Sequence, residues 1–411
     1  MSLKDEFMHI VTTPTSLGEN SLRQNPDTKL TANLKTISEM CINCELCRSE
    51  CAFLSKYGQP KEIAAAFDPM IRAHQVMAFE CSLCGLCAAV CPVKINPCGM
   101  FLEMRREAVR QGCGDFPEHA GILKYEKRGT SRRYTYYALP DNCDTIFFPG
   151  CTLPGTRPDK TIKLYEYMRE RIPALGIVLD CCTKPSHDLG REAYFNAMFG
   201  EMKNFLVTNR IRDVYVACPS CYQVFRRYGK AFTVKTVYEF MARNGLPSTE
   251  KVKQTVSIHD PCSSRFEKQV HSAVRELAAK QGLTIAEMDH HGEKTICCGE
   301  GGAVSFVNSE LASNWSHLIT KESNGKRMIT YCAGCVDLLG RLTPTSHIID
   351  LLFEPEAFIA GKVKVSRSPF TYLNRIRLKA RLKKIVNASV TRERTFVRQQ
   401  EGNQNMSNRL L

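Results

Sequence analysis

The chain reads Cys41-Ile-Asn-Cys44-Glu-Leu-Cys47-Arg-Ser-Glu-Cys51, and the same spacing returns in Cys81-Ser-Leu-Cys84-Gly-Leu-Cys87-Ala-Ala-Val-Cys91. Two residues separate the first three cysteines of each run, so one tight turn can point three thiolates at one metal cluster. Soft thiolate ligands at this spacing are the pattern of a [4Fe-4S] cube. Two such runs therefore predict two cubane clusters.

The fourth cysteine of such a run serves the neighbouring cluster in two-cluster ferredoxins. The spacing therefore predicts one cube held by Cys41, Cys44, Cys47 and Cys91 and a second held by Cys81, Cys84, Cys87 and Cys51. Between the runs, segment 69–79 indicates a helix, so we expect an α-helical ferredoxin domain over residues 36–115. The competing interpretation, two zinc knuckles or a disulfide scaffold, does not require this doubled ferredoxin spacing.

The bulk composition is that of an ordinary globular protein apart from its cysteines. The chain has 411 residues, 43% of them hydrophobic and 24% charged, which allows two or three domains. It has 21 cysteines, and no apolar run follows the charged start at Met1, so we expect a reducing, cytoplasmic location and metal binding. No stretch approaches 18 uninterrupted apolar residues, so no membrane span is expected.

The positive charge is concentrated near the C-terminus. Between Lys362 and Arg398 twelve Lys and Arg residues face a single acid, Glu393, so this segment carries +11 of the net charge of +14. We expect residues 361–411 to be a basic tail that docks on an acidic protein or, peripherally, on the inner face of the cell membrane. An apolar stripe that begins at Leu378 makes packing on the protein or on a partner subunit an equal alternative, and nucleic-acid binding is a weaker one.

The rest of the chain divides by composition and pattern. Residues 1–35 are polar and predict a loose N-terminal arm, and residues 116–144, in a stretch rich in Gly, Pro, Arg and Tyr, predict a linker. From residue 145 short β-branched and aromatic runs alternate with helical stretches, notably 158–171 and 190–208, as in parallel α/β folds. The predicted fold class is therefore α+β multidomain, with a helical ferredoxin domain followed by an α/β domain with parallel strands.

Cysteines directly follow the strands predicted in this second domain. Those after strands 145–150, 176–180 and 214–217 are Cys151, Cys181, Cys182, Cys218 and Cys221. Those after strands 255–259, 294–296 and 328–331 are Cys262, Cys297, Cys298, Cys332 and Cys335. Because the carboxyl ends of parallel strands share one edge of a sheet, each set of five thiols should converge.

The two sets repeat one layout, which predicts an internal duplication. We expect a first module over residues 145–250 and a second over residues 251–360, with ten thiols directed toward the crevice between them. His259 and Asp260, just before Cys262, could donate to cluster sulfur or move protons, although a turn that supports the ligands is their more ordinary role.

A cysteine, then Cys-Cys-Gly, then Cys-x-x-Cys, each some thirty residues apart, is the pattern of the cysteine-rich CCG module. Residues 262–335, with Cys297-Cys298-Gly299, look like a complete example. Together with the double ferredoxin run, residues 36–360 resemble the D subunit of heterodisulfide reductase. They are equally similar to the iron–sulfur subunits of anaerobic glycerol-3-phosphate dehydrogenase and of glycolate oxidase.

The resemblance implies a non-cubane [4Fe-4S] cluster in each module. In the second module, the implied catalytic ligands are Cys262, Cys297, Cys298, Cys332 and Cys335. The first module departs from the pattern, because it reads Cys181-Cys182-Thr183 and a β-branched residue suits a glycine position poorly. Its content stays open between a zinc ion, a second non-cubane cluster and no metal.

The function predicted is that of an iron–sulfur electron-transfer subunit of an anaerobic-type redox complex. Two cubanes would relay electrons between a CCG cluster and a flavin-containing dehydrogenase or other redox subunit, with a quinone-linked membrane protein as a further partner. The first alternative is that this chain is itself the catalytic heterodisulfide reductase. An alternative of another class is a zinc-stabilised binding protein whose basic tail binds nucleic acid.

Overall fold

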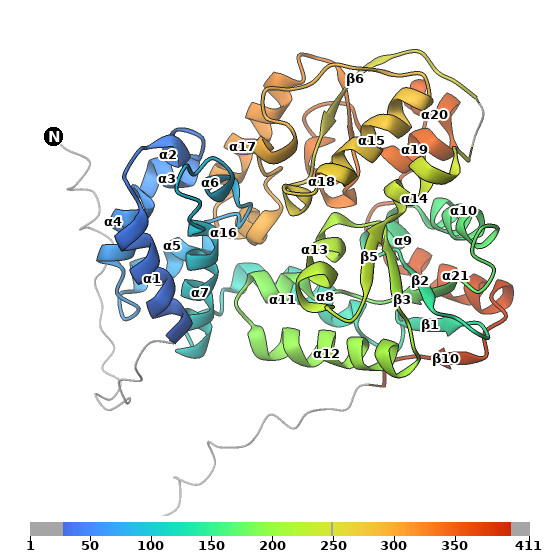
Figure 1. Cartoon of the computed structure of the whole chain (residues 1–411), viewed down its shortest axis with the longest axis horizontal. Coiled ribbons are helices and arrows are strands. Elements are labelled where there is room, and N and C mark those ends of the chain that lie inside the picture. Colours follow the sequence, from blue (N-terminus) through green and yellow to red (C-terminus); the bar gives the residue numbers. More distant parts are fainter. Residues whose placement is uncertain (1–27, 248–249, 396–411) are drawn as a thin grey trace, which may run out of the picture.

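The computed structural model describes residues 28–247 and 250–395, which form a helical N-terminal unit and two sheets covered by helices (Figure 1). The helical unit (blue) lies beside both sheets. The predicted arm at residues 1–27 and the last residues of the basic tail, 396–411, lie outside the described residues. Residues 28–35 of the predicted arm belong to a helix, so the loose arm was predicted too long.

The N-terminal unit consists of helices alone within residues 28–110. They are α1 (Thr28–Met40), α2 (Leu46–Ser49), α3 (Ala52–Tyr57), α4 (Pro60–Ala66), α5 (Arg72–Phe79), α6 (Leu86–Ala89) and α7 (Pro97–Arg110). The two cysteine runs fold alike, because α2 and α6 each follow a residue in the left-handed region, Glu45 at φ 63° and Gly85 at φ 76°. The helix expected over 69–79 is present as α5.

The first sheet has six strands in the order β10-β1-β3-β2-β4-β5. They are β1 (Tyr136–Leu139), β2 (Thr145–Phe148), β3 (Gly176–Leu179), β4 (Asp213–Val216), β5 (Thr233–Thr236) and β10 (Val390–Arg392). Strands β3, β2, β4 and β5 are parallel, whereas β1 pairs antiparallel with β3. The helices are α8 (Ala120–Gly129), α9 (Thr152–Thr156), α10 (Pro158–Arg169), α11 (Lys184–Asp188), α12 (Glu192–Thr208), α13 (Pro219–Tyr228) and α14 (Val237–Asn244).

The second sheet is parallel, in the order β7-β6-β8-β9. Its strands are β6 (Thr255–His259), β7 (Thr284–Ile285), β8 (Arg327–Thr330) and β9 (Thr345–His347). Its α-helices are α15 (Lys268–Lys280), α16 (Val304–Val307), α17 (Ser309–Glu322), α18 (Ala333–Leu339), α19 (Ile348–Phe353) and α20 (Pro355–Ile359). The order matches β3-β2-β4-β5 of the first sheet, so β6 occupies the place of β2 and β8 that of β4.

Two sequence predictions about local structure were wrong. Residues 116–144 are not a linker, because they contain α8 and β1. No strand covers 294–296, where a short 3-10 helix (Gly292–Lys294) precedes the cysteines and the second strand of the module is instead β7. The reason is tertiary: Arg265 donates to the carbonyl of Thr295 over 2.6 Å, so this backbone bonds to a side chain rather than to a strand.

The basic tail folds back onto the first sheet as far as the structure describes it. Helix α21 (Phe370–Ile385) lies against α9 and α10, and β10 pairs antiparallel with β1. Leu378 and Leu382 of the predicted apolar stripe are buried. The alternative in which the stripe packs on the protein itself therefore holds for α21.

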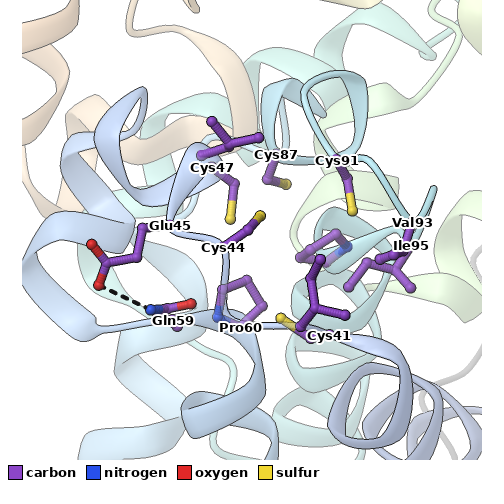
Figure 2. A pocket seen from close by; sticks show the side chains of 13 residues that line it. Cys41, Cys44, Glu45, Cys47, Gln59, Pro60, Cys87, Cys91, Val93 and Ile95 are labelled. Carbon is purple, nitrogen blue, oxygen red and sulfur yellow. Dashed lines mark hydrogen bonds between the residues drawn. The ribbon is translucent and has the colours of Figure 1, made fainter.

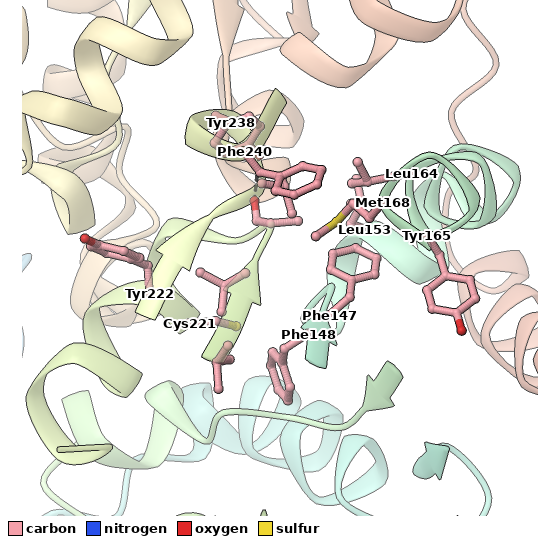
Figure 3. Close-up of a cluster of buried hydrophobic side chains, with 14 of the residues drawn as sticks. Phe147, Phe148, Leu153, Leu164, Tyr165, Met168, Cys221, Tyr222, Tyr238 and Phe240 are labelled. Atoms are coloured by element: carbon pink, nitrogen blue, oxygen red, sulfur yellow. Dashed lines mark hydrogen bonds between the residues drawn. The ribbon is translucent and has the colours of Figure 1, made fainter. Parts of the chain in front are cut away.

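Separate clusters of buried residues connect the parts of the chain, one across the two modules and one between the helical unit and the second module. Around β2 the first cluster contains Phe147 and Phe148, with Leu164 and Met168 of α10 (Figure 3). A second cluster of buried residues joins Phe101 of α7 to Trp315 of α17 in the second module. Among the described residues, no helix has the length and apolar character needed to cross a membrane.

Candidate metal centres

The structure brings Cys41, Cys44, Cys47 and Cys91 together around one pocket, which Cys87 of the second run also lines (Figure 2). Pro60, Val93 and Ile95 give the pocket an apolar wall. Burial, with smaller contributions from the neighbouring thiols of Cys41, Cys44 and Cys91, raises the pKa of Cys47 to about 11. A buried thiol that resists ionisation beside three others fits a metal cluster, because bound iron stabilises the thiolate form.

A second group comprises Cys51, Cys81, Cys84 and Cys87. Burial raises the pKa of Cys51 to about 12, and Cys84 adds to the shift. Burial also raises the pKa of Cys87, with smaller contributions from Cys81, Cys84 and Cys51. The fourth cysteine of each run therefore lies with the first three of the other run, as the spacing predicts.

A fifth thiol, Cys98 at the start of α7, lies beside this second group. Burial is the largest cause of the raised pKa of Cys81 and of Cys87, and the neighbouring thiol of Cys98 is the second largest. Cys98, like Cys113 and Cys143, belongs to none of the cysteine motifs of the sequence.

The five cysteines of the second module also lie together. Hydrogen bonds to the neighbouring thiols of Cys297 and Cys335 lower the pKa of Cys298 to about 7. Cys262 is next to Cys297, and Cys332 is next to Cys335, so the thiols form one continuous group. His259 lies beside Cys298 and Cys335 as well.

The first module gathers its five thiols in the same way. A hydrogen bond from Cys181 and, to a smaller extent, the guanidinium of Arg375 lower the pKa of Cys151 to about 5. Cys221 is next to both Cys182 and Cys218. The five thiols of the first module therefore lie together even though Thr183 replaces the glycine of the Cys-Cys-Gly motif.

Arg375 is a site residue that the sequence did not reveal. It comes from α21, its side chain is buried, and its Nη1 has no hydrogen-bond partner among the described residues. Its guanidinium lies 4.8 Å from the ring centre of Tyr134. The only sequence signal was its place in the basic tail, and that pattern indicated docking rather than a contribution to this site.

Glycines bring the second cysteine run into contact with the second module. A Cβ on Gly301 would lie 2.6 Å from the carbonyl oxygen of Ser82 and 2.8 Å from Sγ of Cys297. Arg265 donates to the carbonyl of Cys84 over 2.8 Å. Only a residue without a side chain permits this approach, so the glycines of the Gly299–Gly302 stretch have a packing role.

The two modules meet at equivalent positions of their sheets. Tyr238 donates to the carbonyls of Ala217, at 2.6 Å, and Tyr331, at 3.1 Å, which immediately precede Cys218 and Cys332. The hydroxyl oxygens of Ser220 and Ser263, one in each thiol loop, lie 3.2 Å apart. The two sets of five thiols therefore flank one boundary.

Arg105 joins all three parts of the chain. It is fully buried and donates to the carbonyls of Ala78 and Phe79 in the helical unit, of Asp188 in the first module and of Gly302 in the second. A buried guanidinium needs hydrogen-bond acceptors for its N–H groups, and here the acceptors are carbonyl groups of several segments. The arrangement therefore forms only when all these segments are in place.

Comparison with known proteins agrees with this geometry. Residues 37–95 match the family model of the 4Fe-4S dicluster domain, and residues 256–339 match the model of the cysteine-rich CCG domain. The chain therefore contains a 4Fe-4S dicluster domain and a CCG domain. The CCG match covers the second module, whose Cys-Cys-Gly motif is intact.

Curated relatives of this CCG protein come from redox complexes. The B subunit of fumarate reductase (CoM/CoB) from Methanothermobacter marburgensis is 27% identical over 72% of the chain and 66% of its own length. The D subunit of dihydromethanophenazine:CoB--CoM heterodisulfide reductase from Methanosarcina mazei is 25% identical over 56% of the chain and 64% of its own length. The chain therefore spans slightly less than two thirds of these relatives. A solved aspartate racemase from Picrophilus torridus matches 56% of the chain at 13% identity with a TM-score of 0.23, too weak a likeness to bear on fold or function.

Proposed function

We propose that the chain is the iron–sulfur electron-transfer subunit of a redox complex, relaying electrons through two cubanes to or from a centre in the second CCG module. The first cube is assigned to Cys41, Cys44, Cys47 and Cys91 and the second to Cys81, Cys84, Cys87 and Cys51. The second-module centre is assigned to Cys262, Cys297, Cys298, Cys332 and Cys335. When bound, such clusters supply reversible one-electron transfer.

One observation carries the proposal. The loop of the second cysteine run contacts the second module directly, at Ser82 against Gly301 and at Cys84 against Arg265. The hydrogen bond with Cys262 lowers the pKa of Cys297, but the hydrogen bond with Cys298, burial and, to a smaller extent, Cys84 raise it overall. The protein thus holds two metal-ligand sets against each other with no intervening element, which favours electron transfer between them.

The test uses the anaerobically purified full chain, with iron and sulfide quantified and a redox titration followed by low-temperature EPR. We expect two cubane signals and a third, separate centre. Gly301→Ala should slow the arrival of electrons at the third centre while leaving the cubane signals intact. Gly121→Ala is the matched control, because nothing lies within 4 Å of a Cβ at that position. A colourless protein that contains zinc without iron would refute the relay and favour the zinc-stabilised binding protein.

Catalysis of disulfide reduction is the second candidate, and the boundary between the modules favours it. Cys151, Cys218 and Cys262 are only half-buried, whereas Cys182, Cys221 and most other thiols of the two modules are buried. Three partly accessible thiols from two facing modules would suit a bound disulfide. The test is whether the chain reduces a heterodisulfide with reduced viologen as the electron donor. Turnover that Cys298→Ala abolishes would establish this activity. If the wild-type chain shows no turnover, electron transfer is its only remaining function.

We further propose that the two modules arose by duplication and that the helical unit is an α-helical ferredoxin domain. The shared strand order, and the equivalent places of Ala217 and Tyr331 at Tyr238, support the duplication. The first module retains five grouped thiols, so we propose that it can hold a metal centre, either zinc or a second non-cubane cluster.

The partners proposed are a flavin-containing dehydrogenase or other redox subunit and a quinone-linked membrane protein. Relatives in redox complexes support a redox partner in general. Exposed Lys362, Lys364 and Arg367 precede α21 and keep peripheral docking on an anionic membrane or an acidic protein open. Salt-sensitive pelleting with anionic vesicles that disappears when these three residues become Gln would support the membrane.

A further inference from the structure

His259 is a buried histidine whose ring makes no hydrogen bond among the described residues. It is the last residue of β6, it is fully buried, and neither Nδ1 nor Nε2 has a partner. The adjacent Asp260 differs, because its carboxylate accepts hydrogen bonds from Arg275 and from the backbone of Gly292. The carboxylate of Asp260 has its hydrogen-bond partners, whereas the buried ring of His259 has none. This indicates that the ring binds a ligand that the protein chain does not supply.

The ring points at two of the thiols assigned to the second-module centre. One ring nitrogen of His259 and the Sγ atoms of Cys298 and Cys335 all lie within 4.8 Å of one another. Ligands of one tetrahedral metal ion with Cys and His ligands are about 3.5 to 3.8 Å apart, given metal–sulfur bonds of about 2.3 Å and metal–nitrogen bonds of about 2.0 Å. The three donors thus need only a small closure to share one ion.

We propose that His259 is a metal ligand of the second module, binding through a ring nitrogen the same metal ion as Cys298 and Cys335. The inference rests on the proposed function, because it requires a metal centre in this module. The CCG motif assigns only cysteines, so this histidine adds an imidazole to a set of thiolates.

The first module provides an internal comparison. Phe148 pairs with Val216 two residues before Cys218, as His259 pairs with Thr330 two residues before Cys332. Phe148 is therefore the structural counterpart of His259, and it packs against Phe225 with ring centres 5.1 Å apart. The second module has a nitrogen donor where the first has a hydrocarbon ring.

Thr330, opposite His259 in the sheet, supports the same conclusion. Its side chain is fully buried and its Oγ1 also has no hydrogen-bond partner among the described residues. Paired residues of neighbouring strands present their side chains on the same face of a sheet. The hydroxyl therefore shares the face of the ring without bonding to it here, and a small movement would let it accept from the ring nitrogen that does not bind the metal, as metal-bound histidines usually require.

The test is pulsed EPR of the anaerobic full chain, with the second-module signal assigned by its loss in Cys298→Ala. We expect a strong nitrogen coupling on this signal that changes when histidine is supplied as the ¹⁵N form. In His259→Phe, which copies the first module, the coupling should disappear. The control is His271→Phe, because His271 is a second buried histidine with an unpartnered Nε2 but lies outside the thiol group.

The isotope experiment needs no variant, so it decides the point even if His259→Phe does not fold. A second-module signal without histidine nitrogen coupling, or with coupling that persists in His259→Phe, would overturn the ligand assignment and leave the relay standing. Absence of any third centre in the iron count and the EPR of the wild-type chain would overturn the relay as well, so the two failures are distinguishable.

Discussion

At the scale of single residues, Thr183 occupies a backbone conformation that suits glycine. It lies at φ 54° and ψ 30°, directly after the paired cysteines of the first module, where Gly299 of the second module has φ 99°. The left-handed region is costly for a β-branched side chain. Thr183 is also fully buried, and its hydroxyl has no partner among the described residues. The sequence departure from Cys-Cys-Gly thus appears in the structure as local strain.

Replacing Thr183 by glycine should relieve this strain. We expect Thr183→Gly to raise the free energy of unfolding by about 1 kcal/mol, measured by urea denaturation of the anaerobic protein. Gly299→Ala is the opposing control, because its Cβ would lie 3.0 Å from the carbonyl of Ala312 at a positive φ, and it should destabilise. A loss of stability in Thr183→Gly would mean that the threonine side chain contributes packing that outweighs its strain.

At the scale of elements, α21 is the segment whose role the charge pattern predicted least well. Its buried side includes Leu378, Leu382 and Arg375, and its exposed side carries Arg377, Arg381, Lys383 and Lys384. Lys379 donates to the carbonyl of Arg132, and Lys379 and Lys383 form ion pairs with Glu393, at 3.0 and 2.6 Å. Part of the positive charge of the basic tail therefore forms ion pairs and hydrogen bonds within the protein.

The packing of α21 can be measured through one leucine. Leu382 is fully buried, so Leu382→Ala should lower the free energy of unfolding by about 2 to 5 kcal/mol. Arg381→Ala, at the neighbouring exposed position, should change it by less than about 0.5 kcal/mol. Both variants are compared by chemical denaturation. Equal, small effects would indicate that α21 is detached from the first module in solution.

At the scale of the whole molecule, a buried ion pair holds the two modules together. Arg157, between α9 and α10, donates twice to Asp350 of α19, with both distances 2.8 Å and both side chains 1% exposed. Removing one partner leaves the other charge buried, so Asp350→Asn should cost about 3 to 5 kcal/mol. The exposed pair of Arg341 and Asp337 gives the control, because Asp337→Asn should cost less than about 1 kcal/mol. Urea denaturation compares the two variants.

A histidine connects the helical unit to the second module and should make their association depend on pH. The ring of His290 bonds to Glu322 of α17 and, over 2.8 Å, to Glu50 beside Cys51. Burial alone would lower the pKa of His290, but its hydrogen bonds with Glu50 and Glu322 outweigh burial and raise the pKa. The charged ring is therefore favoured in the folded protein.

The direction of the pH effect follows from this raised pKa. The contribution of His290 to stability is complete below the unfolded pKa of about 6.5 and is lost as pH rises through the higher folded pKa. Urea midpoints measured from about pH 5.5 to pH 8.5 should fall more steeply for the wild-type chain than for His290→Gln. Parallel pH curves would show that the contacts of His290 add nothing to stability.

The sequence by itself determined the local chemistry of this protein. Cysteine spacing predicted the grouping of Cys41, Cys44, Cys47 and Cys91, because a short loop fixes which thiols can meet. The position of cysteines after strands predicted the two groups of five, because parallel strands end at a common edge. The sequence also predicted five strands from their β-branched and aromatic runs, because these residue types themselves favour the extended conformation. The five strands are β2, β3, β4, β6 and β8.

Only the tertiary structure decided which distant segments complete the sites. Arg375 reaches the first thiol group, Arg105 joins three parts of the chain, and His259 turns its ring toward Cys298 and Cys335. The strand predicted at 294–296 failed for the same reason, because its backbone bonds to Arg265. These contacts join residues far apart in the chain, and no local pattern encodes them. They exist because burial of the shared core brings the segments together.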